Sequence, residues 1–323
     1  MDFRTTIPIK PLARRIDHSQ TIFLIGSCFT ENIAQRLSAA KFRVTASPTG
    51  ILFNPESIAD AIGRCVLRNY PTREELQYGN ERWFSYDFHS SFSNADADAA
   101  LAAMREGIDE GFAALNSADT FIITFGTAIA YRHTESGHVV ANCHKQPQAM
   151  FLREMLSVED IVVRYSALLD SVLRNKQVIF TVSPIRHLGE GMEQNSLSKA
   201  TLRVAIGEIV RRHDNASYFP SFEIMNDDLR DYRFYAEDMV HPSALAIDYI
   251  WKCFSEAAFS PATQSLIERI EAISKAMAHR PFNPQSEAYR RFCQQQLEEI
   301  EKIRLMFPKA NFQREDEFFA KYL

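Results

Sequence analysis

Residues 21–37 read TIFLIGSCFTENIAQRL, a short apolar run that passes through Gly-Ser-Cys into an amphipathic stretch. The apolar run over 21–25 predicts a buried strand. Ile33, Ala34 and Leu37 share one face at helical spacing, which predicts a helix over about 31–40. A strand followed at once by a helix is the repeating unit of a mostly parallel sheet with helices on its faces.

The same alternation of short apolar runs and longer amphipathic stretches continues along the chain. A hairpin is expected over 128–141, with its turn at 135–137. From residue 261 onward, only helices are expected. The further predicted strands are 42–46, 120–125, 178–182 and 216–219, and the further predicted helices are 55–67, 97–115, 158–174, 193–212, 243–258, 262–278 and 285–306.

Strands separated by helices predict an α/β fold whose mostly parallel sheet is covered on both faces. We expect residues 1–260 to form this α/β domain and residues 261–323 to form a helical extension packed on it. A partner-binding role for the extension is the weaker alternative. The helix over 285–306 carries an apolar stripe that is expected to face the α/β domain, made of Phe292, Leu297, Ile300 and Ile303.

The composition is that of a packed soluble protein, because 46% of the 323 residues are hydrophobic and 24% are charged. These values exclude a disordered or collagen-like chain. A chain of this length needs neither a disulfide nor a metal ion to fold. Because 41 acidic residues outnumber 36 basic ones and leave a net charge of −5, a nucleic acid is not an expected partner.

Cysteine usage and the length of apolar runs predict a reducing compartment without a membrane. The five cysteines stand at positions 28, 65, 143, 253 and 293, and no two form a CxxC pair. The most apolar stretch, 121–131, has 11 residues, whereas a bilayer span needs about 20. The first residues contain no apolar segment of signal-peptide type. We therefore expect a cytoplasmic protein that binds no membrane, and the oligomeric state stays open.

Cys28 lies at the turn between the first predicted strand and the first predicted helix. Ligands of α/β sheets bind outside the carboxyl ends of the strands, which is where this turn lies. The N–H groups at a helix N-terminus favour negative charge, so we expect a lowered pKa and a nucleophilic thiolate. The alternative is a small buried residue in a tight turn.

The segment DMVHPS, residues 238–243, places an aspartate three residues before a histidine. Asp238 can hold His241 through one ring nitrogen, which leaves the other nitrogen free to act as a general base. The alternative is a helix cap followed by a surface histidine. Together with Cys28, the segment predicts a nucleophile, histidine and aspartate arrangement of the kind found in hydrolases.

Several further segments extend this pattern over about residues 20–250. The set resembles the GSCFA family, a divergent branch of the SGNH or GDSL-like hydrolase superfamily. The resemblance implies a three-layer α/β/α sandwich, flavodoxin-like in its mostly parallel sheet, and an esterase acting on carboxylic or O-acetyl esters. The segments are GSCFTEN (26–32), PTGILFNP (48–55), FGTAIAY (125–131), NCHK (142–145), TVSPIRH (181–187), SLSKATLR (196–203) and DMVHPS (238–243).

The resemblance also implies roles for individual residues. The first block of the superfamily is Gly-Asp-Ser, and aligning it with IGSCFT places Cys28 at the nucleophile and Ser27 at the aspartate. This departure makes Cys28 the first choice as nucleophile and Ser27 the second. The superfamily's DxxH block falls directly on Asp238 and His241.

The superfamily stabilises its oxyanion with a backbone N–H of the nucleophile turn, a glycine N–H and an asparagine. Gly50 matches the glycine. The third block, which normally carries the asparagine, reads Gly126-Thr127-Ala128 here. We expect Asn142 to replace the missing donor, because NCHK follows the hairpin that leaves the same strand.

Three histidines are further candidates for substrate contacts: His89, His144 and His187. For the FHSSFS loop around His89, an ordinary polar loop is the alternative. A metal site made of Cys28, Cys143 and His144 fits no zinc spacing, so neither a metal nor a cofactor is expected. For Lys199, a solvated helix face is as good an interpretation as a functional one.

The predicted function is hydrolysis of an acyl or O-acetyl ester through an acyl-enzyme on Cys28. The expected partner is a small-molecule or glycan ester. An acyltransferase or a non-catalytic binding module on the same fold are the alternatives.

Overall fold

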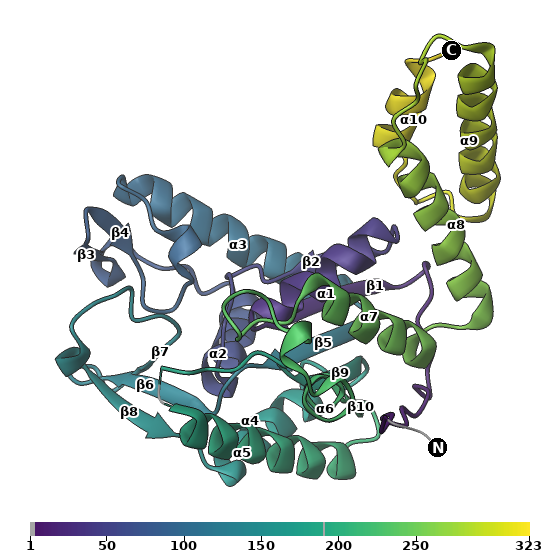
Figure 1. Cartoon of the computed structure of the whole chain (residues 1–323). Coiled ribbons are helices and arrows are strands. Elements are labelled where there is room, and N and C mark those ends of the chain that lie inside the picture. Colours follow the sequence, from purple (N-terminus) through teal and green to yellow (C-terminus); the bar gives the residue numbers. More distant parts are fainter. Residues whose placement is uncertain (1–3, 190) are drawn as a thin grey trace.

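The centre of the computed structural model is a five-stranded sheet with the order β10-β9-β5-β1-β2 (Figure 1). The structure describes residues 4–189 and 191–323. Every neighbouring pair in this sheet is parallel, which confirms the predicted α/β class. The strands are β1 (Thr21–Gly26), β2 (Arg43–Ala46), β5 (Thr120–Phe125), β9 (Gln177–Val182) and β10 (Ala216–Phe219).

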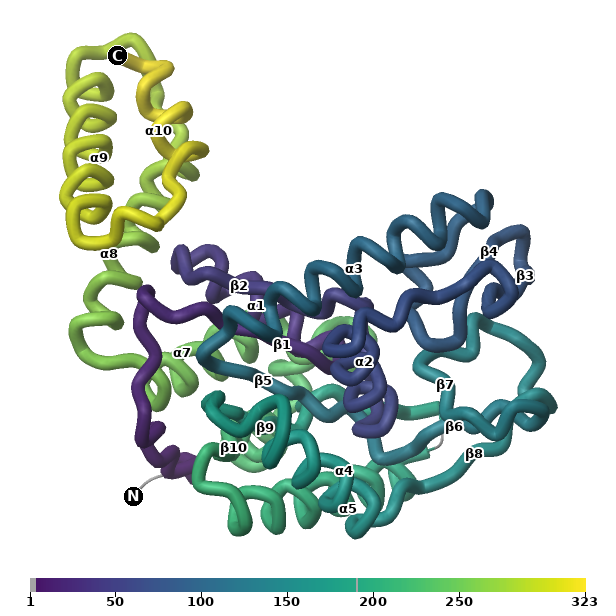
Figure 2. The backbone as a smooth tube through the Cα atoms, turned by 180° about the vertical axis from the view of Figure 1, so that it is seen from behind, coloured from purple at the N-terminus to yellow at the C-terminus, as the bar shows by residue number. Residues whose placement is uncertain are grey.

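Helices cover both faces of the sheet, as Figures 1 and 2 show from opposite sides. One face is covered by α2 (Pro55–Leu67), α3 (Ala97–Ser117), α4 (Val158–Asp170) and α5 (Gly191–Arg212). The other face is covered by α1 (Cys28–Ala39), α7 (Ala244–Ala258) and the short α6 (Ser221–Glu223), which continues as a π-helical stretch over Ile224–Leu229.

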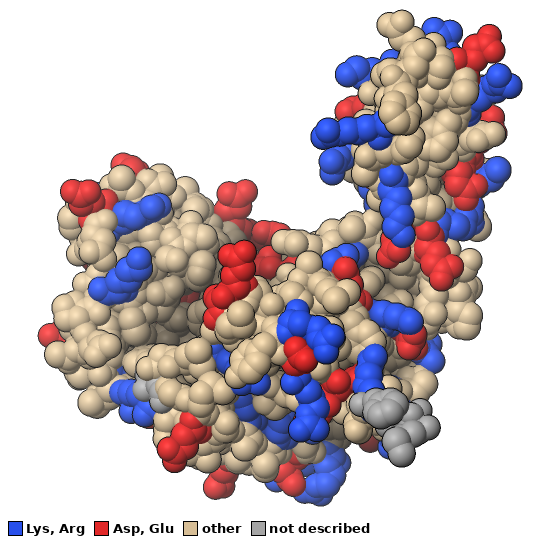
Figure 3. All heavy atoms as spheres, viewed as in Figure 1, with Lys and Arg blue, Asp and Glu red and all other residues tan. Residues whose placement is uncertain are grey.

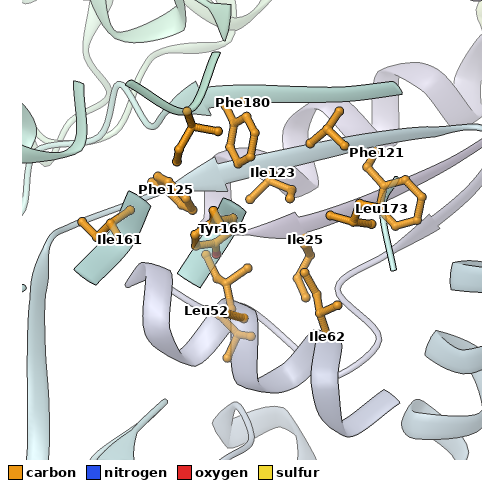
Figure 4. Close-up of a cluster of buried hydrophobic side chains, with 14 of the residues drawn as sticks. Ile25, Leu52, Ile62, Phe121, Ile123, Phe125, Ile161, Tyr165, Leu173 and Phe180 are labelled. Atoms are coloured by element: carbon orange, nitrogen blue, oxygen red, sulfur yellow. The ribbon is translucent and has the colours of Figure 1, made fainter. Parts of the chain in front are cut away.

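The alternation of side chains along the strands explains the two covered faces. In β1, Phe23 and Ile25 belong to one core cluster, whereas Ile22 and Leu24 belong to the other. Successive side chains of a strand point to opposite faces, so an uninterrupted apolar run is what a sheet buried on both sides requires. Figure 4 shows Ile25 of the first cluster beside Ile62 of α2.

The order of the strands places a topological switch point between β1 and β5. The chain runs from β1 outward to β2 at the edge, and then returns to add β5, β9 and β10 on the other side of β1. In open α/β sheets, the crevice at such a point, outside the carboxyl ends of the strands, is where ligands bind. The turn after Gly26 and the turn after Phe125 therefore flank the expected site.

Local sequence signals explain where the helices begin. The Asn54 side chain accepts from the Ser57 N–H, with Pro55 in the first turn of α2, and the Ser243 side chain accepts from the Ala246 N–H at the start of α7. Helix α1 begins at Cys28, three residues before the position predicted from its apolar face. Cys28 is therefore the first residue of the helix rather than part of a longer turn.

Two small antiparallel sheets accompany the main sheet. The predicted hairpin is present as β6 (Ile129–His133) and β7 (Val139–Val140), and β8 (Phe151–Met155) adds a third strand on the other side of β6. A second pair consists of β3 (Gln77–Gly79) and β4 (Arg82–Phe84). The sequence patterns predict neither β8 nor this second pair.

The C-terminal helices form a core of their own, and they project from the α/β body in Figures 1 and 2. Ile300 and Ile303 of the apolar stripe pack with residues of the two neighbouring helices, not with the helices that cover the main sheet. No helix within the described residues combines the length and the apolar character that a bilayer crossing requires. The helices are α8 (Pro261–Ala278), α9 (Glu287–Met306) and α10 (Gln313–Ala320), the last of which was not predicted.

Candidate active site

The turn after β1 aims the first residue of α1 at the carboxyl edge of the sheet. Gly26 has φ +138°, and a Cβ at this position would lie 2.1 Å from the carbonyl oxygen of Thr124 in the neighbouring strand. Only glycine fits this close approach. The Ser27 N–H then donates to the same Thr124 oxygen at 3.1 Å, and the helix begins at Cys28.

Cys28, His241 and Asp238 form a continuous line of contacts. The Cys28 Sγ lies 3.8 Å from Nε2 of His241, and Nδ1 of His241 lies 2.6 Å from Oδ2 of Asp238. The other carboxylate oxygen of Asp238 accepts the backbone N–H groups of Val240 and His241, each at 2.9 Å. These two backbone bonds and the bond from the imidazole lower the pKa of Asp238 to about 2. The carboxylate is therefore ionised throughout the neutral range and orients the ring.

The pKa of Cys28 departs from the sequence prediction. Burial raises the pKa of the Cys28 thiol, and this effect outweighs the backbone N–H groups at Cys28 and Phe29 and the charge of Lys199, all of which lower it. The expectation of a lowered pKa is therefore wrong, because the helix terminus acts in the predicted direction but desolvation is larger. The resting group is a thiol, so its attack requires a base.

Ser27, the second choice as nucleophile, lies beneath the site rather than in it. Its side chain is 0% exposed, and its hydroxyl is buried with no hydrogen-bond partner among the described residues. A Cβ added to Gly126 would lie 3.2 Å from the Cβ of Ser27, which locates the serine between the ends of β1 and β5.

A cavity of about 500 Å³ opens beside Cys28 and His241, and Asn142 and His187 also line it. The carboxamide oxygen of Asn142 accepts the backbone N–H of His144 at 2.8 Å. Its NH₂ group has no partner among the described residues, so it is available to a molecule in the cavity. Of the predicted oxyanion donors other than the nucleophile turn, Asn142 lines the cavity together with Cys28, whereas Gly50 does not.

Three other predicted site residues do not line this cavity. The Gly50 N–H donates to the Ser47 carbonyl at 2.7 Å, so it is not available to an oxyanion, and the predicted role of Gly50 is wrong. Nδ1 of His89 bonds to Ser91. Nε2 of His144 contacts the carbonyl oxygens of Ser85 and Phe88 at 2.9 and 3.1 Å. His89 and His144 thus hold loops next to the site.

His187 lines the cavity and is held neutral. Burial, the nearby charge of Lys199 and that of His241 lower the pKa of His187 to about 4. Its Nε2 atom is buried and has no partner in the described part of the chain. The ring packs edge-on against Phe53, another cavity residue, with centroids 5.6 Å apart. His187 therefore combines a fixed ring with an unused polar atom beside the site.

The structure decides between the two interpretations that the sequence left open for Lys199. It is 1% exposed, which contradicts a solvated helix face, and its Nζ donates to the carbonyl oxygens of Gly126 at 2.6 Å and Ser183 at 2.8 Å. Burial lowers the pKa of Lys199 to about 7. The signal was present in the sequence, because Lys199 lies at helical spacing from the apolar residues Leu202 and Ile206.

Comparison with known proteins adds a family to this geometry. The model of the GSCFA family matches residues 21–254, and that of the GSCFA C-terminal domain matches residues 270–323. The chain belongs to the GSCFA family. No curated protein matches it in sequence.

One solved structure with some similarity to this GSCFA protein is an acetyl xylan esterase, Est2A, from the rumen bacterium Butyrivibrio proteoclasticus. The TM-score is 0.37 and the identity 11%, over 78% of this chain and 64% of that one. The GSCFA chain thus spans less than two thirds of the length of the esterase. A likeness at this level supports no argument about function.

The GSCFA site contains a second cysteine in the same cavity. Burial raises the pKa of Cys143 to about 11, so its thiol is neutral. Across residues 4–189 and 191–323, no group of three or more His, Cys, Asp or Glu side chains is arranged to hold a metal ion. The polar groups that line the cavity include the thiols of Cys28 and Cys143, the imidazoles of His187 and His241, and the amide of Asn142.

Proposed function

We propose that this GSCFA protein hydrolyses acyl esters through an acyl-enzyme on Cys28. The observation that carries the proposal is the line of contacts from the Cys28 sulfur through His241 to Asp238, which opens into a cavity. Cys28 also lies at the carboxyl edge of the sheet, beside the switch point between β1 and β5, where ligands of α/β sheets bind. The resemblance of the motifs to SGNH hydrolases favours an acyl or O-acetyl ester of a small molecule or a glycan.

The first half of the reaction forms a thioester. His241 Nε2 takes the proton from the Cys28 thiol while the sulfur attacks the carbonyl carbon, and the carbonyl electron pair moves to oxygen. The tetrahedral intermediate then breaks its bond to the alcohol oxygen. The leaving alcohol takes the proton from His241, so the imidazole is neutral again. Asp238 stabilises the imidazolium while it carries the proton.

The oxyanion needs donors that are fixed before the reaction begins. The backbone N–H groups of Cys28 and Phe29 face the sulfur at the start of α1, since both lower the pKa of its thiol. The NH₂ group of Asn142, in the segment after β7, supplies a further donor. Donors held in place in this way stabilise charge at no cost of reorganisation during the reaction.

The second half releases the acid. His241 is exposed at the rim of the cavity, so water has access to its Nε2 atom. The imidazole takes a proton from this water as the oxygen attacks the thioester carbonyl. The intermediate breaks its bond to sulfur, and Cys28 recovers its proton from His241. An acceptor alcohol in place of water would give the acyl transfer that is the alternative function.

Kinetics on short-chain aryl esters and O-acetylated sugars test the proposal. We expect wild-type turnover, with kcat lower by about 1,000-fold or more in Cys28→Ala and His241→Ala. Ser27→Ala should retain activity, since the serine lies outside the cavity, and Cys28→Ser should retain a reduced rate. Loss of activity in Ser27→Ala with full activity in Cys28→Ala would reverse the assignment. No turnover of any ester by the wild type would favour the binding-module alternative.

A further inference from the structure

Lys199 carries a buried amine whose charged form has no carboxylate partner among the described residues. Its Nζ donates to the carbonyl oxygens of Gly126 and Ser183, and it lies 5.8 Å from the centre of the Phe222 ring. Two neutral acceptors do not neutralise a cation. An unpaired buried charge costs free energy that an apolar side chain of similar length would not cost. The amine is therefore unexplained by packing alone.

Lys176 has the same kind of hydrogen-bond partners as Lys199 but differs from it in burial. Lys176 also donates to two backbone carbonyls, those of Asn116 at 3.2 Å and Ala118 at 2.6 Å. These carbonyls precede β5, at the edge of the sheet opposite to the site, and Lys176 is only half-buried. Lys176 thus ties loops together with its head near water, whereas Lys199 does so inside the protein.

The position of Lys199 connects it to the nucleophile. Gly126 follows β5 and Ser183 follows β9, so both acceptors lie at the carboxyl edge of the sheet, where Cys28 begins α1. The charge of Lys199 acts on two cavity residues, because it lowers the pKa of both Cys28 and His187. The two segments that it ties lead directly to Thr127 and to Ile185, which line the cavity.

We propose that Lys199 is a positioning residue of the Cys28 site, whose buried ammonium stabilises the negative charge that forms on the sulfur and the oxyanion. Its hydrogen bonds to Gly126 and Ser183 hold the segments after β5 and β9 at the cavity. The charge of Lys199 is then balanced during the reaction by the charge that develops at Cys28. The proposal rests on Cys28 being the reactive residue, as in the proposed function.

The ionisation of Lys199 gives the proposal a pH signature. The pKa of Lys199 is lowered to about 7, whereas those of His187 and Asp238 are lowered to about 4 and about 2. The remaining charged groups that act on Cys28 and His187 are Glu31 of α1 and His241. Lys199 is charged below its pKa and loses the charge as the pH rises through it.

We therefore expect kcat/KM to have an alkaline limb, which comes from the loss of charge on Lys199. The pKa values of His187 and Asp238, about 4 and about 2, lie well below that of Lys199, so neither group produces this limb.

The test compares Lys199→Met with the matched variant Lys176→Met. The rate of Cys28 alkylation by iodoacetamide at pH 6.5, followed by peptide mass spectrometry, should fall about tenfold in Lys199→Met, since removing a nearby cation raises a thiol pKa by about one unit. Lys176→Met should alkylate at the wild-type rate. In ester hydrolysis, Lys199→Met should lower kcat far more than it changes KM, and its alkaline limb should be absent.

Equal alkylation rates in wild type and Lys199→Met would overturn the proposal. If Lys199→Met does not fold, Lys199→Arg replaces it, because a guanidinium keeps its charge and should remove the alkaline limb. If neither variant folds, the wild-type alkylation profile decides. A plot of the Cys28 alkylation rate against pH that changes slope near the pKa of Lys199 supports the proposal. A plot with a single transition, that of the Cys28 thiol, rejects it. Alkylation needs no ester, so failure of this proposal is distinct from failure of the proposed function.

Discussion

The Asn142 side chain is held at one end and free at the other. Its carboxamide oxygen accepts the His144 N–H, and its NH₂ group has no partner among the described residues, although Asn142 lines the cavity. We expect Asn142→Ala to lower kcat by about 100-fold, which is typical for the loss of one oxyanion donor. The measurement is steady-state kinetics on an aryl ester, with circular dichroism to verify folding.

A matched variant separates the two ends of this side chain. Asn142→Asp retains an oxygen for the His144 N–H but loses the NH₂ donor, so its kcat should be at least as low as that of Asn142→Ala. Wild-type kcat in either variant would remove Asn142 from the oxyanion site. A change confined to KM would assign it to substrate binding instead.

At the residue scale, the sequence predicts identities better than ionisation. Cys28, Asp238 and His241 follow from their place next to predicted strands and helices, and the structure brings them into contact. The direction of the pKa shift at Cys28 depends on how much chain covers the thiol, which no local pattern contains. The same holds for Gly50, whose N–H is used by a turn that the motif alone does not predict.

At the scale of elements, the hairpin of β6 and β7 carries Asn142 to the cavity, and a histidine is one of its ties to the neighbouring loop. Nε2 of His138, next to β7, lies 2.9 Å from Oδ1 of Asp87, which also pairs with Arg64. The hydrogen bond to Asp87 raises the pKa of His138 above its ordinary value of 6.5. The hairpin is thus tied to the loop before α3 by a pair that depends on pH.

The sign of this dependence follows from linkage. The pKa of His138 is higher in the folded protein than in the unfolded chain, so protonated His138 stabilises the fold. This stabilisation is fully present below pH 6.5 and is lost as the pH rises through the raised pKa. We expect His138→Ala to lower the free energy of unfolding at pH 5.5 by up to about 1 kcal/mol, and by much less at pH 9. Urea unfolding at both pH values measures this difference.

The control for the hairpin is His279→Ala. His279 is exposed and forms no ion pair within the described residues, so its removal should give the same small change at both pH values. If His138→Ala also gave equal changes at pH 5.5 and 9, the ionic contribution of the pair would be refuted.

The elements that the sequence missed share a physical reason. The central strands β1, β5 and β9 are mostly apolar runs buried on both faces, so their composition identifies them. The residues of β8, FLREM, are neither a continuous apolar run nor an alternating one, and β3 has only three residues, so neither gives a strand signal. Both depend on pairing with a strand elsewhere in the chain, β6 and β4 respectively.

At the scale of the whole molecule, an ion pair helps to connect the C-terminal helices to the α/β body. Nζ of Lys41, which follows α1, lies 2.7 Å from Oε1 of Glu315 in α10, and the two side chains are 16% and 7% exposed. Lys41→Met leaves the Glu315 charge buried and unpaired, so we expect a loss of about 3 kcal/mol in the free energy of unfolding. Urea unfolding monitored by circular dichroism measures it.

The matched control is an exposed pair of the same kind. Arg73 and Asp98 are bonded at 2.7 Å but are 57% and 80% exposed. Arg73→Met should therefore lower the free energy of unfolding by less than about 1 kcal/mol. Similar losses in the two variants would mean that the Lys41 pair does not fasten the helices to the body.

The sequence predicts the α/β body well and the arrangement of the C-terminal helices less well. The apolar stripe of α9 has an amphipathic pattern that fits packing on any apolar face, and the face that it uses belongs to α8 and α10. Surface charge gives little guidance, because basic and acidic side chains are interspersed on the face seen in Figure 3. Patterns of this kind predict that a face is buried but not which partner buries it.

The most direct test of the account is the site of covalent labelling by an activated acyl ester. The reaction is quenched in acid, and the peptide spanning residues 21–37 is sequenced by mass spectrometry, with hydroxylamine used to cleave thioesters. We expect a hydroxylamine-sensitive acyl group on Cys28 in the wild type, none in Cys28→Ala and a strongly reduced yield in His241→Ala. An acyl group on Ser27, or undiminished labelling of Cys28→Ala, would contradict it.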